Sequence, residues 1–152
     1  MNNTLSDSQS QTNEVQVQKT AFRIGAGMLF VSAGHGIISS IIFLILNGRK
    51  NLGWENIVIS IINIFIGVML WQGSAQTAVR WAIIFVLYGV YHLVLGDSYN
   101  FIVDITFGGS LMLLLTGKPS KVGTITSIVI FVVVYLGLLC LGFTSYFILG
   151  IR

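Results

Sequence analysis

Long runs of apolar residues without a charged side chain limit what this chain can fold into. The run from Ile128 to Gly142 is the clearest, and similar runs recur along most of the sequence. Only 9% of the residues are charged, whereas a soluble domain carries roughly 25%. Transmembrane β-strands alternate apolar and polar residues, and these runs do not alternate. The sequence therefore predicts an all-α fold, a polytopic bundle of transmembrane helices.

Five apolar segments separated by short polar turns predict about five spanning helices. The second begins and ends with tryptophan (Trp54 and Trp71), which fits the aromatic belts at the two membrane surfaces. The fourth is short and contains Asp104, so it could instead be a re-entrant segment, which would leave four crossings. The expected spans are 22–46, 54–71, 79–95, 101–116 and 123–149.

The residues before the first span have a different character. They are poor in bulky apolar residues and rich in Ser, Gln and Asn, a composition that cannot bury enough surface to fold. They also lack the order of charges and apolar residues found in a secretory signal peptide. We expect a disordered polar N-terminal tail over residues 1–20, or an amphipathic helix induced near Val15 and Val17. The transmembrane helical bundle then covers residues 21–152.

The distribution of Lys and Arg near the span ends predicts the orientation. With the N-terminus in the cytoplasm, the inner side holds five basic residues and the outer side three, as the positive-inside rule favours. We expect a multi-pass protein of the cell membrane, of the inner-membrane type, with its C-terminus outside. The inner set is Lys19, Arg23, Arg80, Lys118 and Lys121, and the outer set is Arg49, Lys50 and Arg152.

Three of the inner residues are expected to contact lipid headgroups. Arg80, Lys118 and Lys121 follow or precede apolar spans, where long basic side chains extend toward the membrane surface. The ordinary role of such residues is to anchor the inner ends of the helices, and binding of a lipid between helices is the functional alternative.

Polar and small residues recur at spacings of three or four along several spans, which places each set on one helix face. Lipid cannot satisfy their hydrogen bonds, so these faces should point into the bundle. Close helix packing is the ordinary role of such faces, and a polar path is the alternative. His35 near the middle of the first span could continue that path. The sets are Asn56, Ser60, Asn63 and Gly67; Ser32, Gly36 and Ser40; and Asn100, Asp104 and Gly108.

Asp104 is the one aspartate inside a predicted span, where a carboxylate at the centre costs roughly 2.5–3.5 kcal/mol. It follows the Gly96–Asn100 turn by about one helical turn, and His92 precedes the same turn by about one. The two side chains should therefore lie at similar depth and can form a pair. The pair either locks the hairpin or forms a protonatable site in an outer cavity that Asn56, Ser60 and Asn63 would also line.

Motifs that carry catalysis, metals or cofactors are missing from the sequence. There is no HExxH, no GxSxG, no Cys–His metal set and no dinucleotide fingerprint. Cys140 is the only cysteine, so the chain has no internal disulfide. The basic residues form no cluster, which argues against nucleic acid as a partner. We expect no enzyme activity, no metal and no cofactor.

Two hypotheses for function follow from these observations. The leading one is a non-enzymatic membrane subunit or accessory component that acts through helix–helix contacts, in a homo-oligomer or a larger membrane complex. Its partners would be membrane lipids and other membrane subunits or copies of itself. The alternative is a small channel or transporter whose protonatable polar path contains Asp104 and His92.

Overall fold

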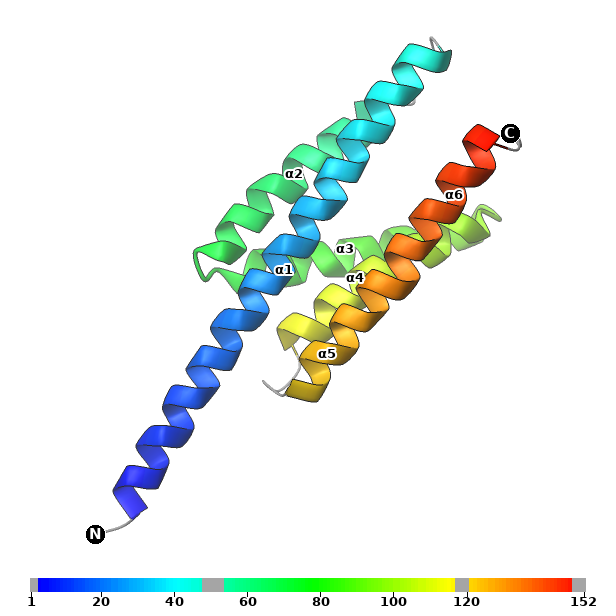
Figure 1. Ribbon diagram of the computed structural model, residues 1–152. Helices are drawn as coiled ribbons and strands as arrows, with labels where there is room; N and C mark the ends of the chain where they lie inside the picture. The colour runs from blue at the N-terminus through cyan, green and yellow to red at the C-terminus, as the bar shows by residue number, and fades with distance from the viewer. Residues whose placement is uncertain (1–2, 48–53, 117–120, 149–152) are drawn as a thin grey trace. The chain divides into compact units, whose positions relative to one another are not determined.

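The computed structural model of this protein describes residues 3–47, 54–116 and 121–148, and every element in these ranges is helical. The predicted all-α fold class is confirmed for this part of the chain. The last three elements form one continuous helix, whose middle is a π-helix (Figure 1). The elements are α1 (Asn3–Asn47), α2 (Trp54–Trp71), α3 (Ala75–Val94), α4 (Ser98–Thr116), α5 (Lys121–Val129), η1 (Ile130–Tyr135) and α6 (Leu136–Ile148).

Within residues 3–47, 54–116 and 121–148, four helical stretches are long and apolar enough to cross a membrane, and α2 contributes a shorter apolar helix over Asn56–Trp71. The sequence predicts a short fourth segment over 101–116, and the helix in the structure is longer. α4 begins at Ser98 rather than at residue 101, because Asp97 caps its N-terminus, and it is 19 residues long. The four stretches are Asn13–Ile42, Ala75–Val94, Ser98–Thr116 and Val122–Gly142.

The N-terminal residues differ from the disordered tail that their composition predicts. α1 runs without interruption from Asn3 to Asn47, so residues 3–20 are helical (Figure 1). The sequence has no proline and no glycine before Gly25. Extending a helix that has already formed adds one hydrogen bond per residue and needs no new nucleus. The apolar half of α1 therefore supports a polar half that composition alone would leave unfolded.

Two glycines end helices with the same hydrogen-bond pattern. Gly96 has φ +78° and donates its N–H to Leu93 O, while the next N–H, of Asp97, donates to His92 O. Gly73 has φ +100° and follows the same pattern at the end of α2. This is the Schellman motif, which favours glycine because a side chain is strained at positive φ. The short α2–α3 and α3–α4 turns are therefore set by single residues.

The chain divides into two compact units, and the first comprises Gln18–Ala78. Within it, small residues let α1 and α2 approach closely. A Cβ atom on Gly36 would collide with Ser60 Oγ and lie 3.4 Å from Asn56 O. One on Gly67 would lie 2.6 Å from the Phe30 ring. The two helices form an antiparallel hairpin whose contact face contains the small and polar residues of both.

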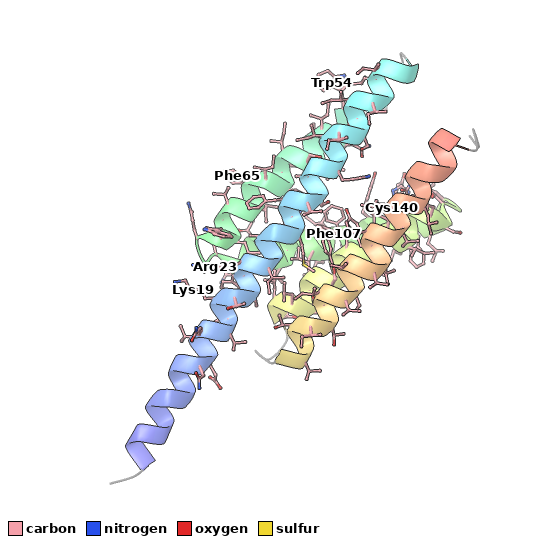
Figure 2. All side chains as sticks on the ribbon, in the orientation of Figure 1. Lys19, Arg23, Trp54, Phe65, Phe107 and Cys140 are labelled. Carbon is pink, nitrogen blue, oxygen red and sulfur yellow. The ribbon has the colours of Figure 1, made fainter. Side chains whose placement is uncertain are left out.

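The second unit comprises Val79–Arg152 together with Met1–Val17. In it, α4 contacts α3 on one side and the α5–η1–α6 helix on the other. Phe107 of α4 is fully buried, and its ring centroid lies 4.7 Å from that of Phe85 in α3. On the other side, it lies 5.2 Å from Tyr135 and 6.2 Å from Phe131. Phe107, labelled in Figure 2, is therefore the centre of the apolar core of this unit.

The π-helix η1 decides which residues of the last helix enter that core. Its wider turn is visible in the bond from Leu136 N–H to Phe131 O, which spans five residues instead of four. Phe131 and Tyr135 are both buried, and their rings stack with centroids 5.0 Å apart. Both rings of this π-helical segment therefore lie near Phe107.

Candidate functional site

His92 lies between two carboxylates at the turn that joins α3 to α4. His92 Nδ1 is 3.6 Å from Asp97 Oδ2, and His92 Nε2 is 3.8 Å from Asp104 Oδ2. The side chains of His92 and Asp104 are 16% and 14% exposed, whereas that of Asp97 is 40% exposed. His92 Nδ1 is buried and has no hydrogen-bond partner. We refer to these three residues as the carboxylate–histidine cluster.

Asp97 is held in place by the start of α4. Its Oδ1 accepts a hydrogen bond of 3.1 Å from Asn100 N, which makes Asp97 the N-cap of this helix. Its Oδ2 accepts one of 2.7 Å from Asn100 Nδ2, and its own N–H donates to His92 O at 2.9 Å. The bond from the Asn100 backbone lowers the pKa of Asp97 below its ordinary value, with smaller help from His92, although partial burial opposes this.

Asp104 approaches His92 from α4. The sequence places His92 and Asp104 at similar distances from the turn, and the structure brings them to 3.8 Å. On α3 itself, the Tyr88 ring stands edge-to-face against the His92 ring with centroids 4.6 Å apart, and Tyr91 lies at 6.0 Å. The imidazole is therefore covered by aromatic rings on its own helix and faces carboxylates at both nitrogens.

This arrangement suits a proton better than a metal ion. A protonated imidazole has two N–H donors, one for each carboxylate, whereas a neutral ring has a single donor. With a neutral ring, one of the two carboxylates therefore faces a nitrogen lone pair. The two carboxylates lie against opposite nitrogens of the ring, so one metal ion could not contact both and remain bound to His92. Among the described residues, no group of three His, Cys, Asp or Glu side chains could hold a metal ion.

Asp97 is the member of the cluster that the sequence prediction missed. The motif Asp97-Ser-Tyr-Asn100 before an apolar helix is a typical N-cap pattern, so its capping role was available from the sequence. Its second role, placing a carboxylate against His92, was not available from the sequence. The direction of its carboxylate toward His92 depends on the Schellman turn at Gly96, which only the folded backbone shows.

The other predicted polar residues belong to the unit of residues 18–78. Ser32, Ser60 and Asn63 lie at the contact between α1 and α2, whereas Asn56 is exposed. Asn63 is fully buried, and its Nδ2 donates to Ser32 Oγ at 3.3 Å. Ser60 Oγ donates to Asn56 O at 2.6 Å within α2. His35 is half-buried in α1. The structure thus brings His92 and Asp104 together in one unit, and Ser32, Asn63, Gly36 and Ser60 together in the other.

The predicted packing residues Ser40 and Gly108 are both buried. Ser40 Oγ donates to Gly36 O at 2.7 Å. A Cβ atom on Gly108 would lie 2.8 Å from Ala82 O and 3.0 Å from Val86 Cγ2, so α3 and α4 are in close contact there. Among the predicted headgroup contacts, Arg80 is exposed near the start of α3. Lys118 and the side chain of Lys121 lie outside the described residues.

Tyr99 makes a contact that the sequence did not indicate. Its hydroxyl donates to Leu138 O in α6 at 2.8 Å, and a Cβ atom on Gly142 would collide with it. The first turn of α4 is thereby fixed to α6, close in the sequence to the cluster residue Asp97 and its partner Asn100. No signal could have revealed this pair, because η1 changes which residues of the last helix face α4.

Comparison with known proteins yields no match: no protein-family model, curated protein or solved structure matches this chain.

Proposed function

We propose that this chain is a non-enzymatic multi-pass integral membrane protein that acts as a subunit or accessory component through helix–helix contacts. The distribution of its side chains carries this proposal. Water-soluble proteins bury apolar side chains and expose polar ones. Here, large apolar side chains are exposed along the helices while several polar side chains are at most 1% exposed. Examples are Ile45, Phe65, Val94 and Leu141 on the outside, and Ser60, Asn63, Ser110 and Ser127 on the inside.

The buried polar groups are engaged in holding helices together. Ser127 Oγ donates to Ser110 O at 2.7 Å, which joins α5 to α4. The bond between Asn63 and Ser32 joins α2 to α1. A lipid environment requires such internal pairing, because it offers no water to a buried polar group. The use of polar residues for packing supports a role in assembly rather than in catalysis.

Part of the α1 surface remains open for a partner helix. Nothing lies within 4 Å of the position that a Cβ atom would occupy on Gly27 or Gly34. These glycines are seven residues apart and therefore share a face, together with the exposed side chains of Val31 and Ile38. Small residues on an apolar face permit close helix approach in a membrane. We propose that a helix of another subunit, or of a second copy of this chain, packs here.

For orientation, we propose an N-terminus in the cytoplasm and a C-terminus outside, with five crossings. The five-to-three distribution of basic residues supports this. Reporter fusions at each terminus and after residues 50, 74, 97 and 118 would test it. Alternating signals from one fusion to the next are expected, and two successive fusions on one side would contradict the five crossings.

Two glycines of α1, Gly34 and Gly36, provide the test of the assembly proposal. Gly36→Leu places its side chain against Ser60 of the same chain and should break the α1–α2 hairpin, and with it the assembly. Gly34→Leu adds bulk to the open face and should dissociate the assembly while the chain stays folded. Native gels after purification in mild detergent give the readout. A wild-type chain that runs as a monomer and retains no other subunit would contradict the proposal.

The carboxylate–histidine cluster supports a second candidate function, a small channel or transporter that moves protons or proton-coupled solutes. The single supporting observation is that both nitrogens of a mostly buried His92 face carboxylates. Reconstituted vesicles should show a pH-dependent flux, and Asp104→Asn should abolish it. A variant that conducts like the parent, or a parent that does not conduct, eliminates this candidate.

A further inference from the structure

The end of the α1–α2 hairpin near the α2–α3 turn carries an arginine whose guanidinium group lies over a tryptophan ring. The Arg23 guanidinium carbon lies 5.5 Å from the centre of the Trp71 ring. Arg23 is exposed, and Trp71, the last residue of α2, is 56% exposed. Lys19 precedes Arg23 by four residues on α1, so the two cations share a helix face, and Figure 2 labels both.

No carboxylate among the described residues forms an ion pair with either cation. The one acidic residue in the unit of residues 18–78 is Glu55, at the opposite end of α2. Sixteen residues of helix separate Glu55 from Trp71, a length of about 24 Å. Glu14 precedes Lys19 by five residues and lies about 140° around the helix from it. Within the described part of this unit, the positive charge at this end therefore has no acidic partner and is available to an anionic ligand.

These residues lie where both helices change from apolar to polar. α1 becomes apolar at Phe22, and α2 ends at Trp71 before the polar turn Gln72–Ser74. Tryptophan is enriched at this depth in membrane proteins, level with the headgroups. A guanidinium group that lies over an aromatic ring keeps N–H donors available, because the ring accepts none of them in an ordinary hydrogen bond, and their fork matches the oxygens of a phosphate.

We propose that Arg23, Trp71 and Lys19 form a binding site for the phosphate group of an anionic phospholipid. This inference rests on the proposed membrane location and names a ligand for one end of the hairpin. In this site, the N–H donors of Arg23 contact the phosphate and the Trp71 ring positions the guanidinium group. Lys19 supplies a second positive charge.

The test is native mass spectrometry of the full chain in mild detergent with phosphatidylglycerol or phosphatidylcholine added at equal concentration. The chain should retain phosphatidylglycerol preferentially. Arg23→Gln should lower that retention about fivefold, as expected for one cation near a membrane surface. Arg23→Lys keeps the charge without the planar fork and should have an intermediate effect. Trp71→Leu should resemble Arg23→Gln.

Lys50→Gln is the charge-matched control, because the proposed topology puts Lys50 at the other membrane surface. A loss equal to that of Arg23→Gln would show general charge attraction and overturn the site. Equal retention of the two lipids, or displacement of phosphatidylglycerol by excess inorganic phosphate, would overturn it as well. Alkaline extraction of membranes tests the location separately. A chain that stays in the membrane pellet without lipid preference overturns the site alone, and a released chain overturns the membrane proposal.

Discussion

His92 and Asp97 meet twice, once in a backbone hydrogen bond and once where their side chains approach each other. Asp97 N donates to His92 O at 2.9 Å and closes the end of α3, while Asp97 Oδ2 faces His92 Nδ1 at 3.6 Å. Asp97 also caps α4 through Asn100. The geometry of the turn and the surroundings of the imidazole therefore depend on the same residue.

Removing the Asp97 cap should destabilise the chain, and asparagine should replace it well. Loss of an N-cap side chain costs about 1 kcal/mol, and asparagine caps helices as well as aspartate does. Asp97→Ala should therefore lower the free energy of unfolding in a detergent titration by about that amount, and Asp97→Asn by clearly less. Equal losses would show that the negative charge facing His92, rather than the cap, carries the stabilisation.

Acid should weaken the same turn. The hydrogen bond from the Asn100 backbone lowers the pKa of Asp97 below its ordinary value of 3.8. A carboxyl group whose pKa is lower in the folded chain stabilises that state above pH 3.8, and this contribution is lost as the pH falls through the folded pKa. The thermal midpoint of the wild type should therefore fall more between about pH 5 and about pH 3 than that of Asp97→Asn. Parallel curves for the two proteins would refute this.

Adjacent glycines in α4 should respond in opposite directions to the same substitution. A Cβ atom on Gly108 would lie 2.8 Å from Ala82 O, whereas nothing lies within 4 Å of one on Gly109. Gly108→Ala should destabilise the chain by about 1–3 kcal/mol, because backbone atoms must move. Gly109→Ala should be neutral or stabilise it by up to about 1 kcal/mol through helix propensity. Thermal unfolding of both variants compares them, and similar midpoints would contradict the close α3–α4 contact.

The Tyr99 hydroxyl should contribute a measurable share of stability. Its bond to Leu138 O is 2.8 Å long and joins α4 to α6. Tyr99→Phe removes this donor and should cost about 0.5–1.5 kcal/mol. Tyr91→Phe is the control, because Tyr91 is 54% exposed and should tolerate the change. If Tyr99→Phe unfolds like the wild type in detergent titrations, the α4–α6 contact does not contribute to stability.

The sequence predicts the ends of helices well where an apolar run meets turn residues. The limits of α2, Trp54–Trp71, coincide with the predicted span because both ends are marked by tryptophan and a polar turn. The proximity of His92 and Asp104 was also predictable, since a short turn fixes the alignment of two neighbouring helices. The helical structure of residues 3–20 was not predictable, because composition does not reveal that the helix of the neighbouring apolar segment extends into them.

Contacts between helices far apart in the sequence were beyond prediction for a physical reason. The pairing of Tyr99 with Leu138 and of Arg23 with Trp71 depends on how antiparallel helices align along their length. Helical periodicity gives the face of a residue and says nothing about this alignment. The role of Asp97 toward His92 depends in the same way on the turn at Gly96.

The six residues of η1 let the last helix hold one residue more than an α-helix would over the same length. A π-turn holds one more residue than an α-turn. Deleting Val133 would let α-helical bonding continue, and the residues after it would keep roughly their present direction, because the wide turn already offsets the extra residue. The bond from Ser127 to Ser110 before η1 and the bond from Tyr99 to Leu138 after it would both remain. The same deletion outside η1 would instead rotate everything after it by about 100°. A protein with one residue fewer in this segment would therefore present the same face of α6 to α4.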